Sequence, residues 1–333
     1  MLLSICIPTF NRSECLLNCL NSILISSKNF QNKFEVCVSD NNSMQNVEDI
    51  INKFKGKINI KFNKNFTNLG HGRNFLKVVS MARGKFVWTI GDDDLILPQA
   101  IETLFKIFES NKDSDFFFIN SYNLDSKYIF SLNQPVDTNF LPKNMKKYSN
   151  YKDSKRMNFF DLINPKISFD FLMGMYLLVF KKEIWDKNLD QINLNDISKP
   201  EIFSTFDNTC GYVKIISKGF SKSKVYLQAE PLSVNLQGKR EWSKMYDFIE
   251  IVRIPEILDI HRSNGLSFFK YHYYKNYSLR NFIPNFLKML LSNKESGLQH
   301  VKFKKNVIKN LIYPNCYLSV IFFLVRRIQK FFI

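Results

Sequence analysis

Short apolar runs alternate with amphipathic segments through the first 122 residues of the chain. Apolar runs that break into polar turns are typical of buried strands, and they occupy residues 2–10, 34–43, 58–63, 85–90 and 114–122. Between them, apolar residues recur every three or four positions, as in helices, at residues 13–26, 47–54, 70–82 and 97–110. This alternation predicts an α/β fold with a mostly parallel sheet and helices on both faces.

The pattern beyond residue 122 is less regular. Residues 123–165 are polar and show no clear periodicity, which predicts a long loop. Residues 169–186 predict a strand followed by a helix, and residues 202–219 predict a helix that ends at Gly219. The sheet expected from the first 122 residues would therefore gain at least one more strand from this part of the chain.

The charge balance narrows the choice of partners. The chain holds 47 Lys and Arg against 30 Asp and Glu, a formal net charge of +17, so an anionic membrane surface and a nucleic acid are the candidate partners. Its six cysteines form no CxxC pair and no zinc-binding spacing. A reduced, cytoplasmic protein without a signal peptide is the simplest interpretation of these features.

Three consecutive aspartates, Asp92, Asp93 and Asp94, follow the apolar run at residues 85–90. Carboxylates placed this close repel one another when all are ionised. A solvated turn or a helix cap would use one of them and leave two unexplained. A Mg²⁺ or Mn²⁺ ion prefers oxygen ligands and keeps coordination positions for phosphate oxygens. On this motif alone both interpretations stay open, and the metal interpretation assigns Asp92 and Asp94 as ligands.

Two other polar turns also follow predicted strands. Ligands of parallel α/β sheets bind at the carboxyl ends of the strands, so the turns PTFNR, SDNNS and GDDD should converge on one face. The stretch NLGHGRN at residues 68–74 offers backbone N–H groups at a helix start together with Arg73, which suits an anion. Asp40 could accept hydrogen bonds from a nucleobase or a ribose, or could serve only its own turn.

The motifs SICIPTFNR, VCVSDNNS and NLGHGRNFLKVVSMARGKFVWTIGDDDLILPQAI resemble the family-2 glycosyltransferases of the GT-A fold. They are most similar to the bacterial subgroup that includes the abequosyltransferases of surface-polysaccharide synthesis. The resemblance is close over residues 1–120 and loose to about residue 235. It implies a Rossmann-like nucleotide-diphospho-sugar transferase that uses Mn²⁺ or Mg²⁺, inverts the anomeric centre and takes a nucleotide-diphosphate sugar as its donor.

The resemblance also implies residue roles at the predicted site. The first loop would line the nucleotide pocket and Asp40 would contact the base. The loop from Asn68 to Gly70, with Arg73, would lie over the base and the diphosphate. Asp92 would face the ribose or the metal, Asp93 would join the donor site, and Asp94 would coordinate the cation. The residues of the first loop are Pro8, Thr9, Asn11 and Arg12.

The acceptor hydroxyl is a poor nucleophile and benefits from a general base. The family usually carries a Glu-Asp pair ahead of a glycine, and the matching stretch here is STFDN, twelve residues before Gly219. Asp207 is therefore the candidate base, with Glu201 as the nearest substitute. Asn208 stands where the second carboxylate is often found. The alternative interpretation of Asp207 is a solvent-facing helix acid.

The region from about residue 236 alternates lysines with aromatic and aliphatic residues, and residues 302–333 contain seven basic residues and no acid. We predict a catalytic domain over residues 1–235 and a helical basic region over residues 236–333. That region is either a helical subdomain with a solvated basic face or a peripheral membrane surface. The apolar run at residues 317–325 is far below the ~20 residues that span a bilayer.

Three functions remain to be weighed on these expectations. The leading one is a metal-dependent glycosyltransferase at the cytoplasmic face of the bacterial inner membrane, acting on a lipid-linked glycan acceptor in capsule or lipopolysaccharide synthesis. The second is a catalytically inactive scaffold of the same fold in a glycan-assembly complex. The third is a polyanion-binding protein whose acidic turn is structural. No nucleic-acid module is recognisable, so nucleic acid ranks below the membrane as a partner.

Overall fold

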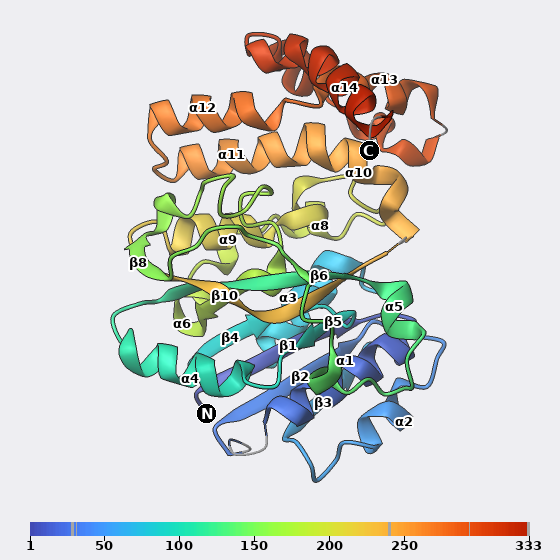
Figure 1. Cartoon of the computed structure of the whole chain (residues 1–333), viewed down its shortest axis with the longest axis vertical. Helices are drawn as coiled ribbons and strands as arrows, with labels where there is room; N and C mark the ends of the chain where they lie inside the picture. Colours follow the sequence, from blue (N-terminus) through green and yellow to red (C-terminus); the bar gives the residue numbers. More distant parts are fainter. Residues whose placement is uncertain (28–29, 31, 239–240, 293, 332–333) are drawn as a thin grey trace.

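The computed structural model describes residues 1–27, 30, 32–238, 241–292 and 294–331. A single sheet runs through it with the strand order β3-β2-β1-β4-β9-β6-β10-β5, while β7 pairs with β6 and β8 with β10 (Figure 1). The strands are β1 (Leu3–Thr9), β2 (Phe34–Asp40), β3 (Ile60–Lys64), β4 (Phe86–Thr89), β5 (Asp94–Ile96), β6 (Phe116–Asp125), β7 (Lys146–Lys147), β8 (Lys155–Asn158), β9 (Leu178–Lys181) and β10 (Lys224–Gln237).

Helices cover both faces of this sheet, as the hydrophobic pattern predicts. One apolar core lies between the sheet and the helices α1 (Ser13–Ser26), α2 (Val47–Asn52) and α4 (Ala100–Ser110). A second core lies under α3 (His71–Ser80), α6 (Lys182–Asp186), α9 (Tyr212–Gly219) and α11 (Ile254–Ser263). Figure 1 shows α9 and α11 above the strands and α2 below them. Strands β1 and β2 are buried along almost their whole length, as strands covered on both faces must be.

The sheet is mostly parallel, and its mixed part comes from the less regular half of the sequence. Strands β1, β2, β3 and β4 pair in parallel, and so do β6 and β10. Strand β9 lies antiparallel between β4 and β6, and β5 runs antiparallel to the end of β10. The sequence pattern did not predict β5, β8 or the fourteen-residue strand β10.

Two predictions for the middle of the chain were wrong in detail. The predicted loop at 123–165 contains the end of β6, the short helix α5 (Ser126–Phe130) and two edge strands. The helix predicted from residue 202 begins only at α8 (Phe206–Cys210), because Thr205 and Asn208 form a capping box there. The side chain of Asn208, which stands where the family often has a carboxylate, is thus used to start a helix.

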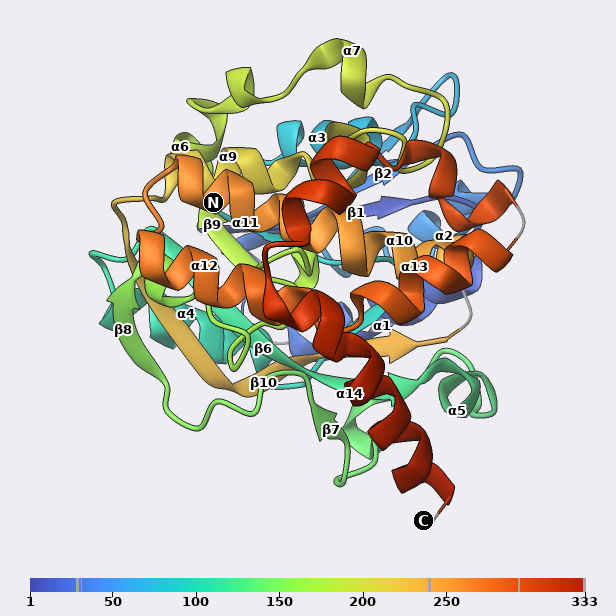
Figure 2. The ribbon, with the colours of Figure 1, turned by 90° about the horizontal axis from the view of Figure 1, so that it is seen from above.

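A layer of helices lies on top of the α9 side of the sheet (Figures 1 and 2). A third apolar cluster holds this layer together, and Cys316 and Ser319 of its last helix are fully buried in it. The helices that complete the fold are α7 (Leu194–Ile197), α10 (Tyr246–Phe248), α12 (Phe268–Ser278), α13 (Phe282–Leu291) and α14 (Pro314–Phe331). The helical character predicted for the basic C-terminal region is thus confirmed.

Candidate active site

Three turns meet at the carboxyl edge of the parallel strands. The register of β1 places Thr9 opposite Asp40 of β2, and places Cys6 opposite Thr89 of β4. The hydroxyl of Thr9 donates a hydrogen bond of 2.7 Å to Asp92, and its carbonyl accepts the N–H of Asn41 at 2.9 Å. The predicted convergence of the loops after β1, β2 and β4 is therefore present in the structure.

Arg12 lies between two of the three aspartates. Its guanidinium is 3.4 Å from Asp92 and 3.3 Å from Asp93, and the side chains of both acids are largely buried. Burial raises the pKa of Asp92 to about 6, with a further contribution from Asp93, while Arg12 and the Thr9 hydroxyl act in the opposite direction. Two carboxylates thus converge on one cationic group. Carboxylate oxygens are also the ligands that suit a divalent cation.

Asp94 faces a different environment. One of its oxygens accepts the N–H of Gly91 at 2.7 Å, and the other accepts the side-chain amide of Asn235 on β10 at 2.8 Å. A Cβ atom at Gly91 would come within 2.6 Å of the Asp93 carboxylate, so a larger residue here would force the Asp93 side chain to move. The role of Asp94 as a metal ligand stays a prediction, and Asp93 lies in the better position to share a cation with Asp92.

Among the described residues, one carboxylate oxygen of Asp40 accepts hydrogen bonds and the other accepts none. Its Oδ1 accepts hydrogen bonds from the backbone N–H and the hydroxyl of Ser43, at 3.0 and 2.6 Å. Its Oδ2 is buried and has no hydrogen-bond partner among the described residues. Asn11 lines the same corner in a left-handed conformation with φ of 53°, which asparagine tolerates better than most residues. An unsatisfied buried acceptor is costly, so Asp40 points to a ligand that donates a hydrogen bond.

A network of asparagines, which the sequence pattern did not predict, fixes the third loop against this corner. Asn41 donates to Asn68 at 2.7 Å and accepts the N–H of Leu69 at 2.8 Å. Asn68 also accepts the N–H of Gly70, which has a positive φ of 79°. Asn74 holds Ser39 from the buried face of α3. A polar residue on the buried face of an otherwise apolar helix was the signal for it.

The remaining residues predicted for this site lie at its rim. Arg73 is exposed at the start of α3, and its guanidinium has no hydrogen bond or ion pair within the part of the chain that the structure describes. Pro8 is half-buried within β1, beside Ser39 of β2. Arg73 is thus a free cation beside the Asn68–Gly70 loop, where the sequence predicts an anion.

The comparison with known proteins now identifies the site's family. The model of the family "Glycosyl transferase family 2" matches residues 4–173, just over half of the chain. The chain belongs to glycosyl transferase family 2. The resemblance predicted from the motifs is confirmed, and the matched residues include all three turns described above.

Characterised relatives of this family 2 chain match it over part of their length. Over 115 residues it is 40% identical to the abequosyltransferase RfbV of Salmonella typhimurium, which covers 34% of each protein. Over 188 residues it is 28% identical to the poly(ribitol-phosphate) beta-N-acetylglucosaminyltransferase TarP of Staphylococcus aureus, which covers 56% of this chain and 50% of TarP. The chain thus spans about a third to a half of the length of these two relatives.

Solved structures share the fold over nearly the whole chain. Residues 1–349 of S. aureus TarS in complex with UDP superpose with a TM-score of 0.60 at 15% identity, over 96% of this chain and 87% of that one. The mannosyltransferase PcManGT of Pyrobaculum calidifontis, in complex with GDP-Man and Mn²⁺, gives 0.53 at 11% identity, over 98% and 87%. At these identities the likeness establishes the GT-A fold.

The predicted base of this family 2 glycosyltransferase, Asp207, is buried rather than solvent-facing. Only 1% of its side chain is exposed, the ammonium of Lys214 lies 2.6 Å from one of its oxygens, and the N–H of Asn193 donates to the other at 2.9 Å. The backbone of Asp207 packs against Gly72 of α3, two residues from Gly70. Glu201, the alternative base, is exposed. The role of either acid in catalysis stays a prediction.

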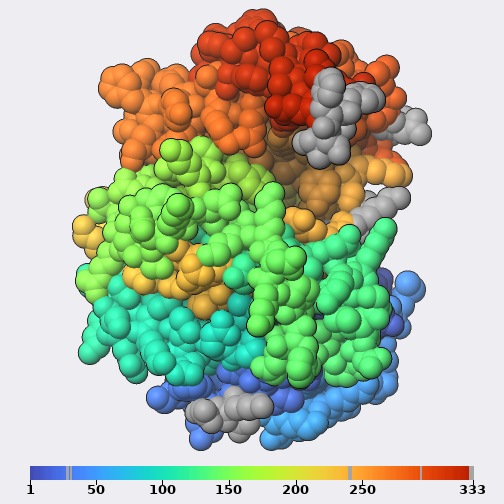
Figure 3. All heavy atoms as spheres, in the orientation of Figure 1, coloured from blue at the N-terminus to red at the C-terminus, as the bar shows by residue number. Residues whose placement is uncertain are grey.

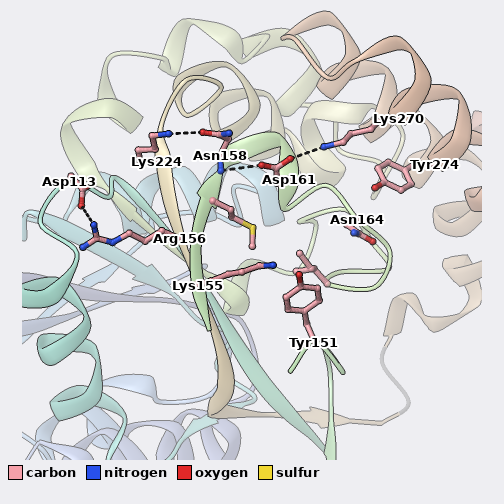
Figure 4. Close-up of a pocket in the computed structure, with 12 residues that line it drawn as sticks. Asp113, Tyr151, Lys155, Arg156, Asn158, Asp161, Asn164, Lys224, Lys270 and Tyr274 are labelled. Carbon is pink, nitrogen blue, oxygen red and sulfur yellow. Dashed lines mark hydrogen bonds and ion pairs between the residues drawn. The ribbon is translucent and has the colours of Figure 1, made fainter. Parts of the chain in front are cut away.

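A cavity of about 620 Å³ lies away from this site (Figure 4). Four of its charged side chains form ion pairs: Lys270 lies 2.7 Å from Asp161, and Arg156 lies 3.4 Å from Asp113. Lys224, which also lines the cavity, is the first residue of β10, and β10 runs parallel to β6. The cavity therefore lies at the amino ends of these strands, opposite the edge that carries the three turns.

Proposed function

We propose that the protein transfers a sugar from a nucleotide-diphosphate donor to a hydroxyl group of a bacterial surface glycan, with inversion and with the help of a divalent cation. The observation that carries this proposal is the convergence of Asp92, Asp93 and Arg12 at the carboxyl edge of the sheet, beside the uncommitted oxygen of Asp40. The acids and the basic side chain would meet the diphosphate end of the donor, and Asp40 its nucleoside end.

The nucleoside half of the donor would bind in the corner between β1 and β2. The free Oδ2 of Asp40 is suited to accept an N–H of a base or an O–H of a ribose. The asparagine network around Asn41 keeps this corner in shape without a ligand. TarS, which shares the fold, has been solved with UDP and with UDP-GlcNAc, and this supports a uridine donor as the first candidate.

The diphosphate half would bind at the acidic turn. No cluster of three or more His, Cys, Asp or Glu side chains suited to a metal occurs among the described residues, so a cation held by Asp92 and Asp93 would take its other ligands from phosphate oxygens and water. Mn²⁺ accompanies GDP-Man in the PcManGT structure. A bound cation would stabilise the charge of the departing diphosphate. Arg12 and Arg73 add positive charge on the protein side.

The acceptor hydroxyl would lose its proton to Asp207. A carboxylate can act as base only when its oxygen is within hydrogen-bond reach of the hydroxyl. The Oδ1 of Asp207 is buried and accepts no hydrogen bond among the described residues, so this oxygen would take the proton. RfbV, TarP and TarS are named for transfers of abequose or N-acetylglucosamine, the last two onto poly(ribitol-phosphate). These names support a surface glycan, which we propose to be lipid-linked, as the acceptor.

Titration calorimetry with UDP, GDP, CDP and dTDP, each with and without Mn²⁺, tests the proposal. We expect one nucleotide to bind in a Mn²⁺-dependent manner, and Asp93→Asn to abolish that dependence. Asp49→Asn, which changes an exposed acid on α2, is the matched control and should bind as the parent protein does. If none of the four nucleotides binds under either condition, the proposal fails. Binding without any transfer to glycan acceptors would instead favour the scaffold alternative.

A further inference from the structure

The last helix of the chain exposes apolar side chains on all of its sides. After the buried residues Cys316 and Ser319, every described side chain from residue 320 to residue 329 is exposed. Figure 2 shows α14 crossing the helical layer, with its end extending past the edge of the body in this view. The exposed apolar residues in this half of the helix are Val320, Ile321, Phe322, Phe323, Leu324, Val325 and Ile328.

More apolar side chains are exposed on the same helical layer. They come from the end of α13 and from the segment between α13 and α14. We call the whole set the C-terminal apolar surface, and it lies at the top of Figures 1 and 3. Besides α14, its members are Leu287, Leu290, Leu291, Phe303, Ile308, Leu311 and Ile312. A soluble monomer rarely leaves so many large apolar side chains in water, so this surface needs an occupant.

Basic side chains accompany the part of this surface that follows residue 301. No acidic residue occurs from residue 302 to the end of the chain. Lys304 and Lys309 are exposed and have no ion pair among the described residues, and the guanidinium of Arg327 lies 5.3 Å from the ring centre of Phe323. Two copies facing each other through this surface would bring like charges together. Anionic lipid headgroups, by contrast, would match the lysines while the apolar side chains enter the acyl boundary.

The length of the helices bears on how a membrane would be met. No single described helix is long and apolar enough to cross a bilayer, whereas the segments Phe303–Asn310 and Pro314–Gln329, bent by 80°, pass that test as a pair. The longest apolar run of α14 ends at Arg326 and Arg327, whose charges favour the headgroup region. We propose that the C-terminal apolar surface docks the protein peripherally on an anionic bilayer, with α14 lying in the plane of the interface.

Docking of this kind is independent of the proposed chemistry, because its residues lie outside the candidate active site. The apolar contribution is tested by flotation of the full chain with phosphatidylcholine vesicles and with vesicles containing 30% phosphatidylglycerol. Phe322→Ser combined with Phe323→Ser should lower the affinity for the anionic vesicles by at least roughly tenfold. The matched control is Phe66→Ser with Phe140→Ser, since both phenylalanines are highly exposed elsewhere, and it should bind as the parent protein does.

The electrostatic contribution is tested in the same assay. Lys304→Gln combined with Lys309→Gln should lower the affinity for anionic vesicles by roughly tenfold to thirtyfold, since each basic residue near such a surface contributes about fivefold. Lys53→Gln with Lys55→Gln, a pair of exposed lysines near α2, should have little effect. Circular dichroism of all variants establishes that a loss of binding is not a loss of folding.

Three results would overturn the inference. The first is equal binding to neutral and anionic vesicles, or losses no larger than those of the two controls. The second is concentration-dependent dimerisation in sedimentation velocity that Phe322→Ser with Phe323→Ser abolishes, because the occupant would then be a second copy of the chain. The third is resistance of vesicle-bound protein to alkaline carbonate extraction, which would indicate a membrane-spanning arrangement of the bent helix pair.

Discussion

The sheet region up to residue 125 and the helical layer from residue 246 use their side chains in opposite ways. In the sheet region, polar side chains at the strand ends bond to one another, as Thr9 does with Asp92 and Asn41 with Asn68. In the helical layer, apolar side chains face outward, and three lysines have no ion pair among the described residues, namely Lys302, Lys304 and Lys309. The first arrangement holds a small polar site in shape before a ligand arrives. The second leaves a broad apolar surface exposed to water unless a membrane or another molecule covers it.

A buried polar joint connects the helical layer to the segment that carries Asp207. Arg253 of the helical layer donates to the carbonyl of Phe203 at 2.8 Å and to the hydroxyl of Thr209 at 3.2 Å, and it pairs with Glu256. Glu256 also accepts Lys305 at 2.8 Å. The segment that carries Asp207 lies between Phe203 and Thr209, so the helical layer positions the candidate base as well as the C-terminal apolar surface.

Substitutions in the acidic turn should have the largest effect and should affect only the sheet region. Asp93→Asn and Asp92→Asn should each lower the transfer rate on the order of 10³-fold, because the charge of the departing diphosphate would lose its cation. Vesicle binding should be unchanged.

Asp94→Asn should act differently. It weakens the contacts with Gly91 and Asn235, and we expect a loss of about 1.5–3 kcal/mol in the free energy of unfolding. Rates with saturating Mn²⁺ and urea denaturation distinguish the two cases. If Asp94→Asn is as inactive as Asp93→Asn but keeps the stability of the parent protein, Asp94 is a ligand of the metal.

A second test concerns the base. Asp207→Asn should lower turnover by about 10²–10⁴-fold while leaving nucleotide affinity within twofold of the parent protein. Lys214→Gln, which removes the partner of Asp207 but keeps its carboxylate, should retain more activity than Asp207→Asn. Initial rates and calorimetry on both variants check this. Equal losses in the two variants would mean that the Asp207–Lys214 pair is structural and that another group, such as Glu201, takes the proton.

The sequence predicted the sheet region well and the long-range contacts of the site poorly. Thr9, Asp40 and Asp92 could be placed together because parallel strands bring their carboxyl ends to one edge. The contact of Asn235 with Asp94 spans 141 residues and depends on β10, which mixes polar residues and Pro231 into its pattern. The Asp207–Lys214 pair could not be foreseen either, because it depends on the turn at Gly211 between α8 and α9.

Substitution of Arg253 tests how much the buried polar joint contributes to stability. Arg253→Met should lower the free energy of unfolding by about 1–3 kcal/mol, because Glu256 would lose one charged partner while it keeps Lys305 and Asn306. Lys106→Met removes an exposed i,i+4 pair with Glu102 and should cost less than about 0.5 kcal/mol. Urea denaturation of both variants measures the difference. If Arg253→Met unfolds at the parent's midpoint, the helical layer and the segment that carries Asp207 are coupled by apolar packing alone.

The smallest expected effect comes from His261, which is fully buried under the helical layer between the hydroxyl of Ser217 and the carbonyl of Phe171. Burial lowers its pKa from an ordinary value near 6.5 to about 4, although the bond to Phe171 acts in the opposite direction. The unfolded chain therefore takes up this proton first as the pH falls. The stabilising contribution is complete above pH 6.5 and is lost progressively down to pH 4, by about 2 kcal/mol between pH 6.5 and pH 5.

His261→Asn keeps a polar side chain without this titration. The difference in unfolding free energy between this variant and the parent protein should therefore narrow by that amount between pH 7 and pH 5. A gap that stays constant would show that His261 has the same pKa in the folded and in the unfolded protein.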